Sequence, residues 1–266
     1  MALQLEPSLL STRWAGRGAV FYERVSVSTN ATVKAALLES ALPVGSLALC
    51  ERQTGGRGRM QRSWEAEEGT ALLMSLLLRP TLAPEQLPLC MLMAAVAVAR
   101  AVEDVAPGLA PGIKWPNDVV LNGLKCAGIL SELTHDLHGD RCVVLGVGVN
   151  LNQTVFPPEL VSRATSLYLT SGAPVDRDAF LRALLSRLEE ASDALERDGF
   201  AGFRGEYERR SVTLRRRVEV LGADARFLGM AERVDDEGAL WVRDESDALH
   251  RVLSADVSVR GANGYA

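Results

Sequence analysis

The chain has 266 residues, of which 47% are hydrophobic, 24% charged and 5% aromatic. This composition is typical of a globular protein and excludes a disordered, collagen-like or low-complexity chain. With 29 Lys and Arg against 34 Asp and Glu, the formal charge is −5. That balance gives no overall basic surface for coating a nucleic acid or a membrane. The length provides for one large domain, or for a large domain and a small one.

The cysteines, histidines and apolar runs exclude several further classes of protein. The four cysteines form no CxxC pair and the three histidines have no metal-ligand spacing, so no zinc site is expected. Most of the cysteines lie in apolar runs, as expected for buried thiols in a reducing compartment. The first 18 residues have no signal-peptide core, and the longest apolar run, at 89–99, is too short to span a bilayer. We therefore expect a cytoplasmic protein without a membrane segment.

The first half of the chain predicts a lead-in followed by alternating helices and strands. Residues 1–20 are expected to be loosely structured and too short for a helix-turn-helix module. A helix is predicted over 31–42, after the N-capping residues 28–30. A buried strand, a glycine- and arginine-rich loop, a second buried strand and an alanine-rich helix are predicted next, at 46–51, 55–64, 70–78 and 84–104.

The second half predicts a hairpin, a long helix and a run of short strands. Asn122-Gly123 indicates a two-residue hairpin turn, because both residues tolerate a positive φ. An amphipathic helix is predicted over 176–195. Strands are predicted at 113–115, 119–121, 125–133 and 142–149, and then, in a small all-β appendage, at 218–221, 227–234, 240–242 and 251–253.

These elements predict an α/β (α+β) protein with a mixed β-sheet, because hairpins and helical crossovers alternate without a regular βαβ repeat. We expect three parts: a lead-in over 1–20, a main domain over 21–212 and a small β domain over 213–266.

The glycine- and arginine-rich segment at 53–64, QTGGRGRMQRSW, is the most informative part of the chain. Between residues 51 and 64 it holds four arginines and one acid, a local charge of +3. Glycines let a backbone bend closely around a ligand, and guanidinium groups suit phosphate or carboxylate oxygens. The spacing matches neither a Walker A loop nor a Rossmann fingerprint. The segment therefore predicts an anion-binding loop, with a solvated basic turn as the alternative.

Two further segments carry candidate site residues. In KWPND (114–118) and the following Lys125, the hairpin should bring Lys125 to face Asp118. A lysine and an aspartate beside an arginine loop suit a phosphoryl or acyl transfer site, whereas a surface salt bridge is the alternative. In GVGVN (146–150), alternating glycines on a strand leave room for a flat or extended ligand, although close packing against a helix explains them equally well.

Taken in this order, the segments resemble the biotin protein ligase family. The matching motifs are STN at 28–30, GRGRxxRxW at 56–64, KWPND with its following Lys and GIL at 114–130, GVGVN at 146–150 and ATSL at 164–167. The resemblance implies a catalytic domain with a mixed sheet of class II synthetase-like type, followed by a small SH3-like β-barrel domain. It covers nearly the whole chain. Met60-Gln61 stand where family members often carry Arg-Gly, but the flanking Arg59 and Arg62 remain.

The resemblance implies an ATP-dependent ligase that works in two steps. The carboxylate of biotin attacks the α-phosphorus of ATP, which yields biotinyl-5′-AMP and pyrophosphate. A lysine of the biotin carboxyl carrier protein domain of acetyl-CoA carboxylase, or of a related carboxylase, then displaces AMP. Mg²⁺ is expected with the ATP, through ligands that the sequence does not identify. Only 27 residues precede Ser28, too few for the winged-helix domain of many bacterial members, so DNA binding is not expected; homodimer formation is left open.

The resemblance also implies roles for particular residues. Lys125 would stabilise charge where carboxylate and α-phosphate meet, and Asp118 would orient or deprotonate the acceptor lysine. Trp64 would pack on the adenylate, and Asn150 would read the adenine edge. The implied catalytic residues are Lys125, Arg57, Arg59 and Asp118; those for biotin are Ser28, Thr29, Asn30, Gln53, Arg57, Gly58, Arg59, Lys125 and Gly128; those for ATP or the adenylate are Arg59, Arg62, Trp64, Asn117, Lys125 and Asn150.

Two other functions remain open from the sequence. A lipoate–protein ligase shares the fold and the adenylate chemistry of this family, but it lacks the GRGRxxRxW and KWPND patterns. A non-enzymatic nucleic-acid-binding module would use the arginine loop, and it predicts interleaved exposed aromatic residues and a wide basic surface. Neither feature is visible in the sequence.

Overall fold

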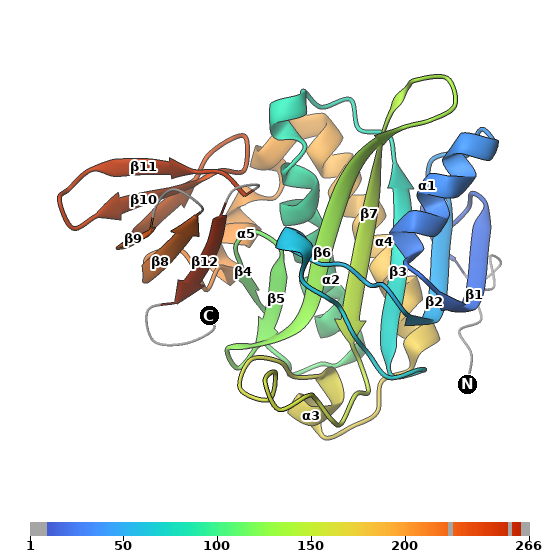
Figure 1. The fold of residues 1–266 in the computed structure, drawn as a ribbon, viewed down its shortest axis with the longest axis horizontal. Helices are drawn as coiled ribbons and strands as arrows, with labels where there is room; N and C mark the ends of the chain where they lie inside the picture. Colours follow the sequence, from blue (N-terminus) through green and yellow to red (C-terminus); the bar gives the residue numbers. More distant parts are fainter. Residues whose placement is uncertain (1–9, 223–225, 255–256, 262–266) are drawn as a thin grey trace.

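The computed structural model describes residues 10–222, 226–254 and 257–261 and contains two β-sheets (Figure 1). The strands of the larger sheet are β1 (Val20–Ser26), β2 (Leu47–Gln53), β3 (Ala71–Leu78), β4 (Gly112–Lys114), β5 (Asp118–Leu121), β6 (Leu124–His135) and β7 (Arg141–Asn150). Those of the smaller sheet are β8 (Arg217–Gly222), β9 (Arg226–Val234), β10 (Leu240–Asp244), β11 (Leu249–Val252) and β12 (Val257–Gly261). The helices are α1 (Thr29–Glu39), α2 (Leu89–Val105), α3 (Leu167–Ser171), α4 (Arg177–Asp198) and α5 (Arg204–Arg210), with short 3₁₀ turns η2 (Arg59–Gln61), η3 (Pro84–Gln86) and η4 (Gly199–Gly202).

The larger sheet is mixed and forms the centre of the molecule. Its order is β1-β2-β3-β7-β6-β5-β4, in which β1 and β2 run parallel and all other neighbours are antiparallel. The smaller sheet is antiparallel, in the order β11-β10-β9-β8-β12, and lies next to the β4 end of the larger one (Figure 1). This arrangement confirms the predicted α/β class with a second, all-β part.

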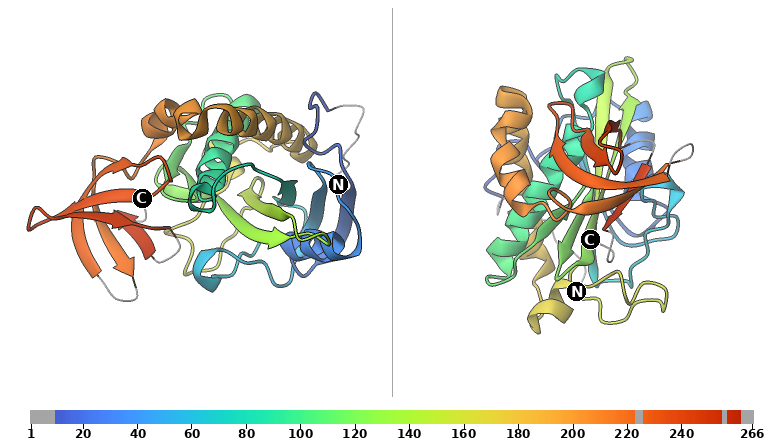
Figure 2. Two further views of the ribbon diagram at one scale, coloured as in Figure 1. Left: turned by 90° about the horizontal axis from the view of Figure 1, so that it is seen from above. Right: turned by 90° about the vertical axis from the view of Figure 1, so that its left-hand side faces the viewer.

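Helices cover both faces of the larger sheet (Figure 2). The side chains of a strand alternate between the two faces, and on β7 Val143, Leu145 and Val147 face the core that α2 and α4 complete. Cys142 and Val144 face the opposite side, where they pack against α1. We call this second side the α1 face. Helix α2 is apolar around nearly its whole circumference because it is buried between the sheet and α4.

The predicted two-residue turn is confirmed at the β5–β6 hairpin. Asn122 and Gly123 have φ values of 50° and 79°, the left-handed conformation that such turns require. The hairpin pairs Asp118 with Gly128 and folds β6 back beside β5. It thereby brings the KWPND segment next to the start of β6.

One strand was not predicted from the sequence, and the predicted start of one helix was wrong. Strand β1 begins at Val20, inside the predicted lead-in; an exposed edge strand has no buried face to create an alternating pattern. Helix α1 begins at Thr29, not at 31, and the Ser28 side chain makes no capping hydrogen bond. The lead-in before residue 10 lies outside the described residues.

The C-terminal part and two short helices also differ from the prediction. Strand β12, which pairs with β8, is a fifth strand where four were expected. No pairing between β11 and β12 closes the sheet into a barrel within residues 217–222, 226–254 and 257–261. Helices α3 and α5 were not predicted, because segments of 5 and 7 residues are too short for a helical periodicity to show.

The chemistry of the cysteines agrees with the prediction. All four are free and buried, and burial raises the pKa of Cys50, Cys90 and Cys126 to about 12. Among the described residues, no cluster of three His, Cys, Asp or Glu side chains could hold a metal ion. None of the helices described is long and apolar enough to cross a membrane.

A buried ion pair fastens α4 to the larger sheet. The Arg177 guanidinium lies 2.7 Å from Glu51 on β2 and donates to the carbonyl of Ala71 at 3.1 Å. The side chains of Arg177 and Glu51 are 9% and 5% exposed. Removing one partner of such a pair leaves an uncompensated buried charge.

We predict that Arg177→Met lowers the free energy of unfolding by about 3 kcal/mol, as measured by urea denaturation. Arg187→Met is the matched control, because the Arg187–Asp104 pair is about one-third exposed and surface pairs of this kind contribute about 0.5 kcal/mol. Equal losses in the two variants would contradict the stabilising role assigned to the buried pair.

Candidate active site

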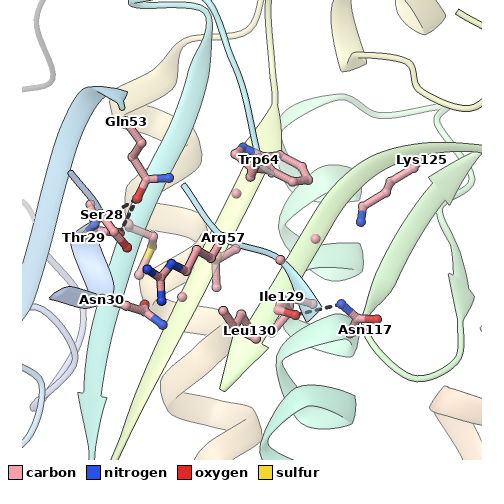
Figure 3. Close-up of a pocket in the computed structure, with 16 residues that line it drawn as sticks. Ser28, Thr29, Asn30, Gln53, Arg57, Trp64, Asn117, Lys125, Ile129 and Leu130 are labelled. Atoms are coloured by element: carbon pink, nitrogen blue, oxygen red, sulfur yellow. Dashed lines mark hydrogen bonds between the residues drawn. The ribbon is translucent and has the colours of Figure 1, made fainter. Parts of the chain in front are cut away.

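A pocket on the α1 face brings together most of the residues predicted for the site (Figure 3). It lies between the N-terminus of α1, the loop after β2, and strands β6 and β7, and its empty volume is about 440 Å³. Ten predicted residues line it: Ser28, Thr29, Asn30, Gln53, Arg57, Gly58, Trp64, Asn117, Lys125 and Gly128. The lining residues that had not been assigned a role are Met74, Ile129, Leu130, Gly146, Val147 and Gly148.

Three glycines form the floor of the pocket. Gly128 on β6 pairs with Gly148 on β7, and the indole of Trp64 lies against both. A Cβ atom at Gly148 would come within 2.6 Å of Trp64 Cε2, and one at Gly128 within 2.9 Å of Trp64 Cζ3. At Gly146 a Cβ would meet Asn30 Oδ1 at 2.5 Å. The alternating glycines therefore let Trp64 and Asn30 approach the sheet closely. The close packing that the sequence left as an alternative is thus present on this face, and at Gly146 it is packing against helix α1.

The first turn of α1 and the end of β2 build one polar end of the pocket (Figure 3). Gln53 Oε1 accepts hydrogen bonds from the backbone N–H of Thr29 at 2.9 Å and from its hydroxyl at 3.3 Å. Gln53 thus satisfies an N-terminal amide of α1 that the Ser28 side chain leaves unpaired. The Gln53 side chain consequently both stabilises the start of α1 and forms part of the pocket wall.

Two residues that the sequence analysis missed complete this end. Ser75 Oγ on β3 lies 2.6 Å from Thr29 Oγ1 and 2.5 Å from Asn30 Oδ1. Glu132 on β6 accepts from Asn30 Nδ2 at 2.5 Å. Neither residue belongs to a motif; the available signal is the alternation of β6, which places Glu132 on the same face as Gly128.

The opposite end of the pocket carries a lysine–aspartate ion pair. Lys125 Nζ lies 2.6 Å from Asp118 Oδ1 and 5.3 Å from the centroid of the Trp64 ring. The backbone of Lys125 is fixed by hydrogen bonds to Arg163 and Thr165 at 2.8 and 2.9 Å. The predicted approach of Lys125 to Asp118 is confirmed. Since the two side chains are 25% and 13% exposed, the pair is a partly buried one and not a surface salt bridge.

Arg59 and Arg62 do not line the pocket. Arg59 donates to Asn117 Oδ1 at 3.2 Å and to the backbone carbonyl of Ser254, after β11. Burial lowers the pKa of the Arg59 guanidinium. Asn117 in turn donates to the Ile129 carbonyl at 2.9 Å. In this conformation Arg59 therefore connects the loop to the smaller sheet, whereas Arg62 is exposed.

Asn150 is buried two residues beyond Gly148, on the same face of β7. Its Nδ2 donates to the Thr165 carbonyl at 3.1 Å, while its Oδ1 has no hydrogen-bond partner among the described residues. Trp64 Nε1 is likewise buried without a partner in this part of the chain. Asn150 Oδ1, an acceptor, and Trp64 Nε1, a donor, can therefore form hydrogen bonds with a ligand on this face.

The site as a whole suits an elongated small molecule. Hydrogen-bonding groups lie at one end, the glycine floor with Trp64 against it lies in the middle, and Lys125 lies at the other end, with Arg57 reaching over the pocket toward Thr29 and Asn30 (Figure 3). Such a pocket can hold a molecule with a polar head and an anionic tail, next to a lysine that stabilises negative charge. Fold and site together define a mixed α/β protein with a pocket suited to a small acidic molecule.

Comparison with known proteins identifies the family. A model of the biotin/lipoate A/B protein ligase family matches residues 22–150. The bifunctional ligase/repressor BirA of Bacillus subtilis is 34% identical over 252 residues, which cover 94% of this chain and 76% of that protein. The chain therefore belongs to the biotin/lipoate A/B protein ligase family.

Two further comparisons agree with this assignment. The biotin–[acetyl-CoA-carboxylase] ligase of Mycobacterium tuberculosis is 36% identical over 217 residues, covering 80% of this chain and 79% of that protein. The structure of the biotin protein ligase from Aquifex aeolicus in complex with biotin and ATP superposes with a TM-score of 0.80 at 29% identity, covering 92% of this chain and 99% of that one. The fold expected from the sequence motifs is thereby confirmed.

We predict that Gly148→Ala displaces the Trp64 indole, because the added Cβ would lie 2.6 Å from Cε2, well inside the contact distance of about 3.5 Å between carbon atoms. The chain has four tryptophans, so the indole N–H signals in a ¹⁵N–¹H spectrum are few enough to assign. The Trp64 signal should shift strongly while the other three stay in place. Gly205→Ala, in α5, is the control; a Trp64 signal that is equally unmoved in both variants would contradict the described contact.

Proposed function

We propose that this chain activates biotin with ATP as biotinyl-5′-AMP and transfers the biotinyl group to a lysine of a biotin carboxyl carrier protein domain. The observation that carries this proposal is the order of groups along one pocket. The ureido ring of biotin requires hydrogen bonds at one end, which Ser28, Thr29, Asn30 and Gln53 can supply. Its thioether ring and valeryl chain require an apolar, open middle, and its carboxylate requires a cation such as Lys125 at the other end.

In the first step, a carboxylate oxygen of biotin forms a bond to the α-phosphorus of ATP, and the bond from that phosphorus to the pyrophosphate oxygen breaks. Two anions must approach each other, so fixed cations lower the barrier. We assign this role to Lys125, whose backbone and side chain are both held. Arg57, whose guanidinium lies toward Thr29 and Asn30 in this conformation, and Gly58 would join it when the loop closes over both substrates. The loop also excludes water from the mixed anhydride.

The nucleotide is assigned to the part of the pocket beyond Trp64. There the unpartnered Trp64 Nε1 and Asn150 Oδ1 offer one donor and one acceptor, as an adenine edge requires. We propose that Asn117, Arg59 and Arg62 complete this region when the loop closes over ATP. Mg²⁺ would enter with the ATP, whose phosphates and water supply most of its ligands.

In the second step, the ε-amine of the acceptor lysine attacks the carbonyl carbon of the mixed anhydride, and the bond to the phosphate oxygen breaks to release AMP. The amine must first lose a proton, against an ordinary pKa of about 10.4. We assign Asp118 to orienting this amine or accepting its proton, because its carboxylate is the one that faces Lys125 at the reacting end of the pocket.

Biotin is favoured over lipoate by the polar end of the pocket. The dithiolane ring of lipoate offers no N–H or carbonyl group to Thr29, Asn30 and Gln53, so binding it there would leave buried polar groups unpaired. A nucleic-acid-binding module is disfavoured by the arginine loop itself. It is a single loop in a chain with a formal charge of −5, which provides no wide basic surface for a phosphate backbone.

We further propose the setting in which the chain works. The acceptor is the carrier domain of acetyl-CoA carboxylase or of a related carboxylase. A cytoplasmic location is supported by the four free, buried cysteines. We retain the boundaries 1–20, 21–212 and 213–266 as the proposed domain division, with the last part in the position of the small C-terminal domain. The absence of DNA binding stays a prediction, and the sequence left homodimer formation open.

Intact mass spectrometry of a purified carrier domain tests the proposed function. The domain is incubated with the protein, Mg-ATP and either biotin or lipoate, alongside an acceptor Lys→Arg variant. A single biotin-sized mass increase that depends on ATP and on that lysine is expected. Modification by lipoate alone would assign the chain to lipoate transfer, and no modification by either acid would contradict the mechanism.

Lys125→Ala should slow formation of biotinyl-5′-AMP by about 10²- to 10³-fold, the usual cost of removing one fixed charge-stabilising group. The assay is biotin-dependent exchange of pyrophosphate into ATP. Lys125→Arg keeps a cation at this position and should retain much more activity. If Lys125→Ala forms the adenylate at the wild-type rate, Lys125 does not stabilise charge in this step.

Asp118→Asn should slow the transfer step by about 10²-fold or more, since an amide accepts no proton. The measurement supplies purified biotinyl-5′-AMP and the carrier domain, so that adenylation is bypassed. Raising the pH toward the ordinary lysine pKa of about 10.4 should recover part of the lost rate, because more of the acceptor amine is then already neutral. If transfer is unchanged and adenylation alone is slowed, Asp118 only holds Lys125 in place.

A further inference from the structure

A carboxylate that no motif marks lies directly behind the polar end of the pocket. Glu132 lies on β6, four residues after Gly128 and two after Leu130, on the α1 face that carries the pocket. It accepts from Asn30 Nδ2 at 2.5 Å and from Lys34 Nζ at 2.8 Å. Both partners belong to α1, so Glu132 connects the strand to the helix directly behind the polar end of the pocket.

The hydrogen bonds at Asn30 fix which way its amide group points. An ionised carboxylate only accepts, so the group that faces Glu132 must be the NH₂ of Asn30. The carbonyl oxygen of Asn30 then faces Ser75 Oγ at 2.5 Å. A flip of the amide would place its oxygen against Glu132 and two acceptors in contact. Because Asn30 is 5% exposed, water cannot compensate for such a mismatch.

Glu132 is suited to this task because it stays ionised. Burial opposes its ionisation, but hydrogen bonds from Lys34 and Asn30 and the positive charges of Lys34 and Arg57 outweigh that effect and hold its pKa below the ordinary value. Lys34 itself is about one-third exposed. It therefore contributes charge to Glu132 without touching the pocket.

We infer that Glu132 is a positioning residue for substrate recognition: it holds the Asn30 amide in the one orientation that presents its remaining N–H to the head group of the substrate. The inference rests on the proposed function, in which that head group is the ureido ring of biotin. Glu132 touches no substrate atom in this assignment. It acts through Asn30, as Ser75 does from the other side.

The test compares Glu132→Gln with Lys34→Gln in the full chain. A glutamine at 132 can present either its NH₂ or its carbonyl to Asn30, so the amide orientation is no longer fixed. The Kd for biotin, measured by calorimetry, and the KM for biotin should then rise roughly tenfold, the usual effect of losing one charge-assisted hydrogen bond. The KM for ATP and kcat should stay close to wild type. Lys34→Gln breaks the same ion pair but leaves the Glu132–Asn30 bond, so its biotin affinity should remain near wild type.

A swapped variant separates positioning from simple packing. In Asn30→Asp combined with Glu132→Gln, the carboxylate and the amide exchange places, so a hydrogen bond between them re-forms and the Tm should recover toward wild type. Position 30 then has no N–H to offer, and biotin affinity should stay at least roughly tenfold weakened. Recovery of affinity together with Tm would overturn the inference, because it would mean that any bond between the two positions suffices.

The remaining outcomes are equally decisive. If Glu132→Gln and Lys34→Gln lose the same biotin affinity, the inference is overturned, because the ion pair between Glu132 and Lys34 then accounts for the effect. Unchanged affinity in Glu132→Gln, with normal biotin binding by the wild type, would overturn the positioning role alone. A wild-type protein that binds no biotin would overturn the proposed function and this role with it.

Discussion

The site depends on one steric constraint, the absence of side chains at three positions of a packed sheet. Gly128, Gly146 and Gly148 lie on the α1 face of β6 and β7, where any Cβ atom would come within 3 Å of Trp64 or Asn30. Protein interiors are close-packed, so such a gap in a sheet is normally filled by the layer above. Here it is filled by Trp64 from the arginine loop and by Asn30 from α1. The glycines thereby determine how close the loop and the helix approach the sheet.

Because of this constraint, the sheet, helix α1 and the arginine loop each contribute a different part of the site. The sheet contributes the floor, Ser75 and Glu132; α1 contributes its first turn; the loop contributes Arg57 and Trp64. Most polar contacts at the head of the pocket join two different elements, as Gln53 to Thr29 and Glu132 to Asn30 do. The pocket is therefore rigid at the head, where discrete hydrogen bonds select a ligand. It is more open at the loop, which must admit two substrates and an acceptor.

Sequence reasoning located the parts of the site that carry local signals. The hairpin turn at Asn122-Gly123, the approach of Lys125 to Asp118, and the segments that meet in the pocket could all be predicted from residue types and spacing. Ser75 and Glu132 could not, because each is a single polar residue in a strand, and only the register of β3, β7 and β6 brings them to Asn30. Edge strand β1 escaped prediction for the opposite reason, since an exposed strand buries no alternating face.

The contacts of Arg59 could not be predicted from its neighbours in the sequence either. They explain how the smaller sheet contributes to the site. The Trp115 indole, buried beside the KWPND turn, donates to the Gly238 carbonyl in the β9–β10 turn at 3.0 Å. Arg59 donates to the Ser254 carbonyl after β11 and to Asn117. The smaller sheet thus contacts the KWPND segment through the buried Trp115 and the arginine loop through Arg59. Because these contacts use backbone carbonyls, they constrain the geometry of the smaller sheet and not its side chains. The side chains of that sheet are constrained separately, because Val218, Val220 and Ala231 belong to the same apolar core as Trp115.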